Sequence, residues 1–172
     1  MSIRIRPEEP ADAPAIRQVV EAAFPTAAEA RLVGLLRAGG NLTISLVAEE
    51  DDGTIVGHVA FSPVIVDGES AEQSGIGLVP LAVLPDHQRQ GIGGRLVREG
   101  LAACEAAAFG FVVVLGEPAY YQRFGFDRAD RRGLGNEYGA DEAFMVVELR
   151  DGAIPARGGV VRYGAEFGEF AL

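Results

Sequence analysis

Glycines and arginines gather at one point of the sequence, where a buried apolar run ends and a helical pattern begins. The apolar run through Leu81, Ala82 and Val83 stops at Pro85, and the helical pattern begins near Gly91. Glycines let a ligand approach the backbone closely, and the free N–H groups in the first turn of a helix attract anions. The glycines and arginines in this segment are Gly91, Gly93, Gly94, Arg89, Arg95 and Arg98. The segment predicts a binding site for a phosphate-type anion.

Three interpretations of this segment are open. The first is a glycine-rich turn between a strand and a helix that binds no ligand. The second is a dinucleotide-binding fingerprint, which fits poorly because Leu96 stands at the position of the third glycine and because the glycines follow well after Pro85. The third is a cradle for the pyrophosphate of coenzyme A.

The third interpretation agrees with a known family. The pattern Gln88-x-x-Gly91-x-Gly93 resembles the Gln/Arg-x-x-Gly-x-Gly/Ala signature of the GNAT superfamily of N-acetyltransferases. A second block, Ala119 to Phe126, resembles the family's short helix that ends in Tyr-x-x-x-Gly-Phe. The segment Gly116 to Tyr121 is similar to a branch of predicted, largely uncharacterised bacterial N-acetyltransferases.

The resemblance implies acetyl-CoA as co-substrate and no metal. The pantetheine arm would lie along the strand end at Leu81 to Val83, where the central strands splay and a backbone N–H polarises the thioester carbonyl. The pyrophosphate would rest on the N–H groups of Arg89 to Gly94. The cofactor-binding residues expected on this basis are Leu81, Ala82, Val83, Gln88, Arg89, Gln90, Gly91, Ile92, Gly93 and Gly94.

The resemblance also implies direct attack by the acceptor amine, without an acyl-enzyme. Tyr121 aligns with the family tyrosine that protonates the departing CoA thiolate. The alternative is that its ring only packs beside Phe124, and Tyr120 is expected to be structural. Cys104 lies in the middle of a helix on its apolar face, so we expect a small buried side chain.

Glu117 is the first candidate for the general base. Many family members have Asn near this position, so Glu117 is a departure from the family pattern, and a solvated acid at a helix start explains it equally well. His58 lies on an expected strand and is more often a structural histidine, whereas His87 is expected to be exposed in the loop.

Composition excludes several classes of site. All 15 basic residues are arginine, which excludes a Walker-type phosphate loop, a Schiff-base lysine and a biotinyl or lipoyl attachment site. One cysteine and two histidines exclude a disulfide and a Cys/His zinc site. The net charge of −10 disfavours nucleic acid and anionic membranes as partners. Without a signal sequence or membrane span, a cytoplasmic protein is expected.

Hydrophobic periodicity and turn residues predict the elements that position these residues. We expect helices over residues 10–23, 27–38 and 91–108 and a short helix through Tyr121. We expect strands over residues 3–6, 44–48, 55–61, 75–84, 111–115, 144–149 and 160–163, with a hairpin turn at 50–53 and a polar loop at 67–74. On the third helix, Val97, Leu101, Cys104 and Ala108 are expected to share the buried face.

Together these elements predict one α+β (α/β layered) domain over residues 1–172. The resemblance implies a GNAT-like acyl-CoA N-acyltransferase fold with a mixed, mostly antiparallel central sheet, splayed central strands and helices on both faces. The expected function is acetyl transfer from acetyl-CoA to a small-molecule amine or a peptide N-terminus. The alternative is a catalytically idle acyl-CoA-binding or sensing module on the same fold. A homodimer is left open.

Overall fold

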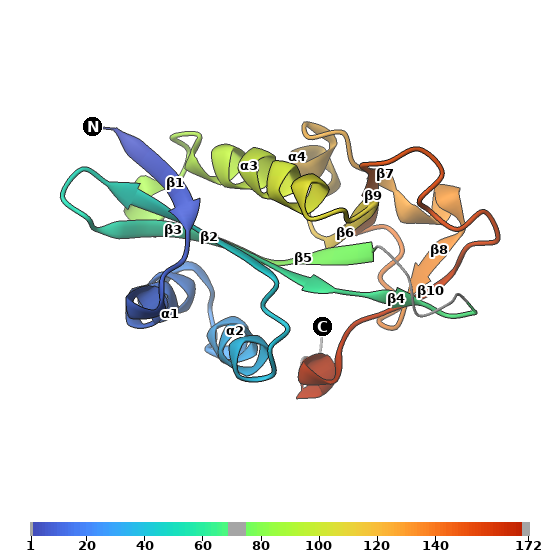
Figure 1. Ribbon diagram of the computed structural model, residues 1–172, viewed down its shortest axis with the longest axis horizontal. Helices are drawn as coiled ribbons and strands as arrows, with labels where there is room; N and C mark the ends of the chain where they lie inside the picture. The colour runs from blue at the N-terminus through green and yellow to red at the C-terminus, as the bar shows by residue number, and fades with distance from the viewer. Residues whose placement is uncertain (1, 69–74, 170–172) are drawn as a thin grey trace. The chain divides into compact units, whose positions relative to one another are not determined.

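The computed structural model describes residues 2–68 and 75–169 (Figure 1). Two compact units can be distinguished along the chain. The first unit consists of Met1–Phe61 and Val79–Gly100, and the second of Ser62–Leu78 and Leu101–Leu172.

The first unit carries the predicted anion-binding segment. Its sheet has the strand order β1-β2-β3-β5, and β2 is antiparallel to both β1 and β3. The strands are β1 (Ile3–Pro7), β2 (Ile44–Glu50), β3 (Ile55–Pro63) and the end of β5 (Gly75–Val83). The helices are η1 (Pro10–Asp12), α1 (Ala13–Ala23), α2 (Ala28–Ala38), η2 (Pro85–His87) and the start of α3 (Ile92–Ala106).

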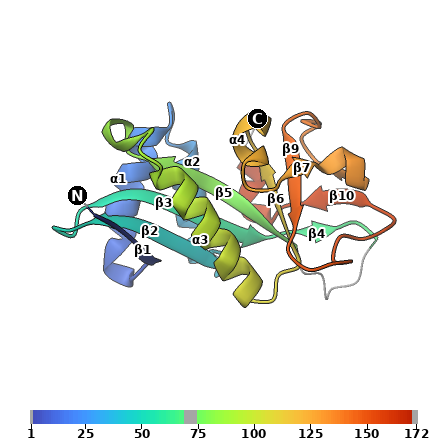
Figure 2. The ribbon, with the colours of Figure 1, turned by 90° about the horizontal axis from the view of Figure 1, so that it is seen from above.

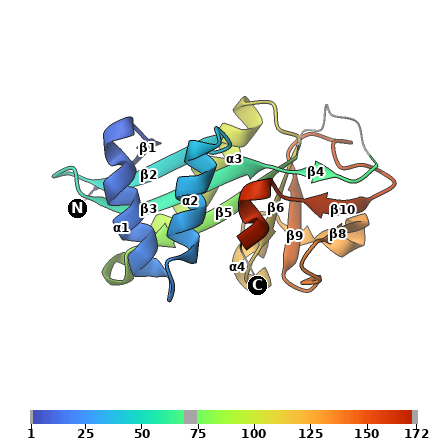
Figure 3. The same cartoon turned by 90° about the horizontal axis from the view of Figure 1, so that it is seen from below.

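Helices cover both faces of this sheet. Figure 1 shows α1 and α2 below the strands and α3 above them; Figure 2, from above, shows α3 crossing the strands, and Figure 3, from below, shows α1 and α2 side by side. On the lower face, Ile16, Val20 and Val33 form one apolar cluster with Val47 and Ala82. On the upper face, a Cβ on Gly57 of β3 would meet the side chains of two α3 residues, Ile92 and Leu96, so this glycine lets α3 pack closely.

The second unit combines two small sheets. One has the order β5-β6-β9-β7, in which β9 is antiparallel to both neighbours, and the other has the order β4-β10-β8. The strands are β6 (Phe111–Leu115), β9 (Phe144–Glu148), β7 (Asp127–Arg128), β4 (Ile65–Val66), β10 (Gly159–Arg162) and β8 (Leu134–Asn136). The helices are α4 (Pro118–Gln122), η3 (Ala129–Arg132) and η4 (Ala165–Glu169).

The pairing of β5 with β6 is short. These two strands are parallel, and their register joins Gly75–Gly77 to Phe111–Val113. This pairing ends well before β5 itself ends at Val83. The sheets therefore mix parallel and antiparallel pairs, mostly antiparallel, and the predicted α+β class is confirmed.

Some predicted details are wrong. Ala108 does not continue the buried face of α3, because the helix ends at Ala106 and Ala108 is exposed with a left-handed φ of 70°. Three short strands, β4, β7 and β8, were not predicted, since strands of two or three residues show no periodicity. Most of the predicted polar loop, residues 69–74, lies outside the described residues.

Candidate active site

The loop after β5 is anchored to the strand that precedes it. The side-chain amide of Gln88 donates from Nε2 to the carbonyl oxygen of Val83 over 3.0 Å. The short helix η2 lies between these two residues, and the backbone N–H of His87 closes it on Leu84 O at 2.8 Å. The family-type glutamine therefore fixes where the loop begins.

Two residues of the loop have a left-handed backbone. Arg89 has a φ of 63° and Gly91 a φ of 83°. This conformation costs energy for arginine but little for glycine. No atom lies within 4 Å of where a Cβ on Gly91 would stand, so the space above this glycine is open. Alternating left-handed residues turn successive N–H groups toward one side, which is a common anion-binding arrangement.

The backbone donors of this loop are unused. The first helical bond of α3 runs from Arg95 N to Gly91 O at 3.1 Å. None of the N–H groups from Arg89 to Gly94 donates to another residue in the described parts of the chain. Ile92 is 3% exposed and anchors the helix start in the core. The three N–H groups of the loop and the three that open α3 are therefore available to a phosphate group.

The neighbouring arginines differ in how they are held. Arg89 is exposed and forms no ion pair with any described residue. Arg95 donates from Nη1 to the carbonyl oxygen of Ile3 over 2.7 Å, and its Nη2 lies 3.9 Å from Glu99. Arg89 is consequently the most available cation next to the loop.

The strand end expected to bind pantetheine lies in the same unit as the loop. Leu81 is half-buried, whereas Ala82 and Val83 are buried. Just beyond them, Leu84 N donates to Val56 O of β3 at 2.9 Å. The structure thus brings all ten predicted cofactor-binding residues into the first unit.

Tyr121 belongs to the second unit and is 7% exposed. Its ring packs edge-on against Tyr120 and Phe126, with centroid distances of 5.1 and 5.5 Å. It also occupies the space that a Cβ on Gly116 would need. Burial, and to a smaller degree Tyr120, raises the pKa of the Tyr121 phenol, so the hydroxyl stays protonated and can act as a donor.

Glu117 stands at the N-terminal end of α4, the helix that carries Tyr121. Its carbonyl oxygen accepts the N–H groups of Tyr120 and Tyr121, both at 3.1 Å. Its side chain is exposed and does not cap the helix. The carboxylate is therefore available, but no contact in the described structure orients it.

The histidines and the cysteine differ in their agreement with the predictions. Cys104 is fully buried, as predicted, and burial raises the pKa of its thiol to about 12. His87 is half-buried rather than exposed, because its Nε2 lies 3.3 Å from Glu50 Oε1. His58 is fully buried and contacts Ser45, a residue without any motif signal that sequence reasoning missed.

Two further searches cover the described residues, 2–68 and 75–169. No group of three or more His, Cys, Asp or Glu side chains in them is arranged to hold a metal ion. None of their helices combines the length and apolar character needed to cross a membrane.

Comparison with known proteins gives consistent results. Residues 41–128 match the model of the acetyltransferase (GNAT) domain. The chain is 42% identical to the uncharacterised N-acetyltransferase YhbS of Escherichia coli K12, over 96% of this chain and 99% of that protein.

Two similar proteins have been solved in complex with the expected type of cofactor. The structure of Escherichia coli YhbS in complex with CoA matches with a TM-score of 0.93 and covers 99% of this chain and 94% of that one. A GNAT family acetyltransferase from Brucella melitensis in complex with acetyl-CoA matches with a TM-score of 0.81 and 42% identity, over 96% of this chain and 98% of that one.

Proposed function

The chain belongs to the GNAT acetyltransferase family, and on that basis we propose that it transfers the acetyl group of acetyl-CoA to an acceptor amine. The observation that carries this proposal is the row of unused N–H groups from Arg89 to Gly94. It lies at the motif that binds pyrophosphate in the family, and two relatives at 42% identity have been solved with CoA or acetyl-CoA.

In this proposal the first unit binds the cofactor. The pyrophosphate accepts hydrogen bonds from the loop N–H groups, and the exposed guanidinium of Arg89 adds positive charge. The pantetheine arm lies along Leu81 to Val83, and a backbone N–H of that segment stabilises the oxyanion of the tetrahedral intermediate.

The second unit supplies the acid. The amine nitrogen attacks the thioester carbon directly, and the C–S bond breaks with its electron pair on sulfur. Tyr121 then gives its phenolic proton to the thiolate. Burial raises the pKa of this phenol, so the hydroxyl is protonated when the thiolate forms, and the same shift makes it a weaker acid than a free tyrosine. Glu117 is the base predicted from the sequence.

The proposal includes the wider expectations as well. Residues 1–172 act as one N-acetyltransferase domain, which is supported by the match of the YhbS structure over 99% of the chain. The acceptor is a small-molecule amine or a peptide N-terminus, and the enzyme works in the cytoplasm. Light scattering tests the homodimer, which would double the chain mass of 18.1 kDa.

The decisive experiment is a measurement of CoA release with a panel of acceptors. The panel contains spermidine, phenethylamine, glucosamine and a tetrapeptide with a free N-terminal alanine. We expect at least one of them to release CoA faster than buffer alone and to yield the acetylated product by mass spectrometry. Tight acetyl-CoA binding without turnover on any amine would instead identify the idle acyl-CoA-binding module.

A further inference from the structure

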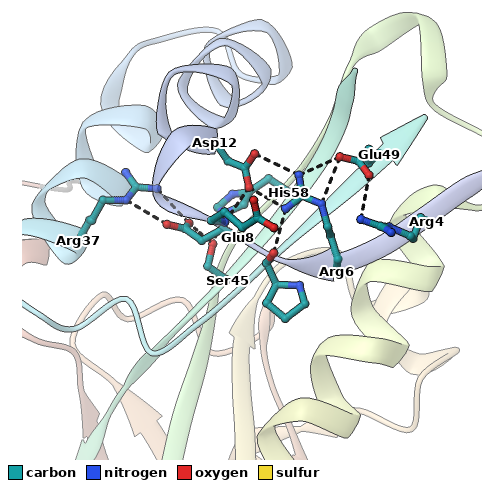
Figure 4. Close-up of polar contacts among 10 residues, drawn as sticks. Arg4, Arg6, Glu8, Asp12, Arg37, Ser45, Glu49 and His58 are labelled. Atoms are coloured by element: carbon teal, nitrogen blue, oxygen red, sulfur yellow. Dashed lines mark hydrogen bonds and ion pairs between the residues drawn. The ribbon is translucent and has the colours of Figure 1, made fainter. Parts of the chain in front are cut away.

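A chain of polar side chains, in which His58 is fully buried and the other members are partly buried, lies beneath the sheet of the first unit. Figure 4 shows its members, which come from the segment after β1, from α2, from β2 and from β3. His58 Nε2 lies 2.8 Å from Ser45 Oγ, and the Ser45 hydroxyl hydrogen-bonds to the Glu8 carboxylate. Arg37 Nη2 donates to Glu8 Oε1 over 3.0 Å.

This chain fixes the tautomer of His58. A carboxylate only accepts hydrogen bonds, so the single hydrogen of the Ser45 hydroxyl goes to Glu8. Ser45 Oγ must then accept the hydrogen on His58 Nε2. A neutral imidazole has one N–H, and Nδ1 therefore carries a lone pair and no hydrogen.

The Nδ1 atom of His58 has no use within the fold. It is buried and has no hydrogen-bond partner in the described part of the protein. The bond from Nε2 would suffice to tie the strands together, and a buried acceptor without a partner costs free energy. In a common arrangement for proton transfer, an acidic side chain orients a histidine through one ring nitrogen, and the second ring nitrogen acts as the base.

His58 is close to the predicted thioester site. Val56 O accepts Leu84 N, and because β5 ends at Val83, β3 can lie beside β5 only by running antiparallel to it. His58 stands two residues beyond Val56 on β3, and Ala82 on β5 stands two residues before Leu84. Val47 is the register partner of His58 and belongs to the same apolar cluster as Ala82, which places both on one face of the sheet.

We propose that His58 Nδ1 accepts the proton that the acceptor amine loses during its attack on the thioester, and that Ser45 and Glu8 orient the ring for this step. This inference rests on the proposed acetyl transfer and assigns the base to His58 rather than to Glu117. The C–N bond forms, the C–S bond breaks, one proton moves from nitrogen to Nδ1 and one from Tyr121 to sulfur. Loss of this proton from His58 and uptake of one by the Tyr121 phenolate restore both groups.

The electrostatics suit a base that is ready throughout the neutral range. Burial lowers the pKa of His58 to about 4, with Glu8 raising it and Arg37 lowering it in smaller measure. The other charged groups nearby pair with one another: Arg6 with Asp12 at 2.7 Å and with Glu49 at 2.8 Å. The attacking nitrogen becomes more acidic once it is bonded to the carbonyl carbon, which lowers the basicity that the proton acceptor needs.

The variant that separates proton transfer from structure is His58→Gln. Its side-chain amide can still donate to Ser45 Oγ, but it offers no base at the position of Nδ1. We expect kcat with the best amine of the panel to fall by about 10²- to 10⁴-fold, with the acetyl-CoA Kd and the unfolding midpoint close to those of the wild type. The wild-type pH–rate profile should show an acid limb near pH 4, the pKa of His58, and this limb should be absent from the variant.

Val59→Ala is the matched control, because Val59 is the buried neighbour of His58 on the opposite face of β3. It should lower stability and leave kcat within about threefold of the wild type. A wild-type kcat in His58→Gln, or a loss of kcat that equals the loss in Val59→Ala, would overturn the proposed role of His58. The proposed acetyl transfer would be unaffected. If none of the amines in the panel makes the wild type release CoA, both the proposed function and this inference fail. If His58→Gln does not fold, Ser45→Ala gives the same test, with an expected loss of roughly tenfold in kcat.

Discussion

Tyr121 combines a buried ring with a hydroxyl that keeps its proton, and this combination makes its role measurable. In Tyr121→Phe the ring still fills the space beside Gly116, so acetyl-CoA binding should be nearly unchanged. The missing proton matters only as charge builds on the sulfur, so we expect kcat to fall by about 10² to 10⁴. Steady-state measurement of CoA release gives kcat, and calorimetry gives the Kd of acetyl-CoA; together they check this prediction.

An acyl donor with a more acidic thiol provides the control for Tyr121. Such a leaving group needs less protonation, so the difference between the wild type and Tyr121→Phe should shrink. Equal kcat values for both proteins would leave Tyr121 as a packing residue, and a large rise in the Kd of acetyl-CoA would make it a binding residue.

His58 should make stability depend on pH in a defined window. Its pKa is about 4 in the folded protein against an ordinary value of 6.5, so the unfolded chain binds more protons between these values. The stabilisation is therefore complete above pH 6.5 and is lost progressively as the pH falls toward 4. The full effect corresponds to about 3 kcal/mol.

Urea unfolding of the wild type and of His58→Gln at pH 7 and pH 4.5 measures this effect. The wild type should lose more free energy of unfolding than the variant between the two conditions. Parallel losses in both proteins would show that His58 takes up no additional proton on unfolding.

Single residues also show where prediction from sequence ends. The sequence predicted the burial of Cys104 from its place on the apolar stripe of a helix. The motif predicted a catalytic role for Tyr121, which stays a prediction. The contacts of His58 with Ser45 and of His87 with Glu50 join residues from different strands or from a strand and a loop. No local pattern contains such pairs, because they arise only when the strands take their register.

At the level of elements, we propose that the loop from Gln88 to Gly91 and the start of α3 together bind the pyrophosphate of acetyl-CoA. A valine at Gly91 would strain the left-handed backbone and fill the open space where the phosphate is expected. We predict that Gly91→Val raises the Kd of acetyl-CoA by at least about tenfold, or about 1.4 kcal/mol. Isothermal titration calorimetry measures this Kd directly.

Gly53 offers a control with the same backbone geometry. It has a φ of 90° in the β2–β3 turn, and a Cβ there would also meet nothing within 4 Å. Gly53→Val should show a similar loss of stability with unchanged acetyl-CoA affinity. If both variants bind acetyl-CoA like the wild type, the glycine at 91 serves only the turn.

The elements themselves were largely predictable because each has a clear signal. Pro85 ends β5, glycines open α3, and the turn at 50–53 closes as Gly53 N donates to Glu50 O at 2.9 Å. The end of α3 was predicted two residues too far, since an alanine run continues the helical pattern beyond Ala106. The strands β4, β7 and β8 depend on pairing with distant residues rather than on their own composition.

For the whole molecule, ligand binding should appear as stabilisation. A ligand that binds only the folded state and is present at 100 times its Kd adds about 2.7 kcal/mol. For a chain of this length that corresponds to an increase in Tm of about 5 to 10 °C. We predict this increase with acetyl-CoA and none with NAD, measured by differential scanning calorimetry. An equal increase with NAD, or none with acetyl-CoA, would contradict the coenzyme A assignment.

The burial of Cys104 determines how turnover can be followed. Because the protein's one thiol is shielded and remains protonated at neutral pH, a colorimetric thiol reagent added to the native enzyme should react with released CoA alone. The same reagent would detect one further thiol per chain as soon as the core opens. The absorbance of one sample can therefore report product formation at temperatures where the protein is folded, and loss of the native state when the sample is heated further.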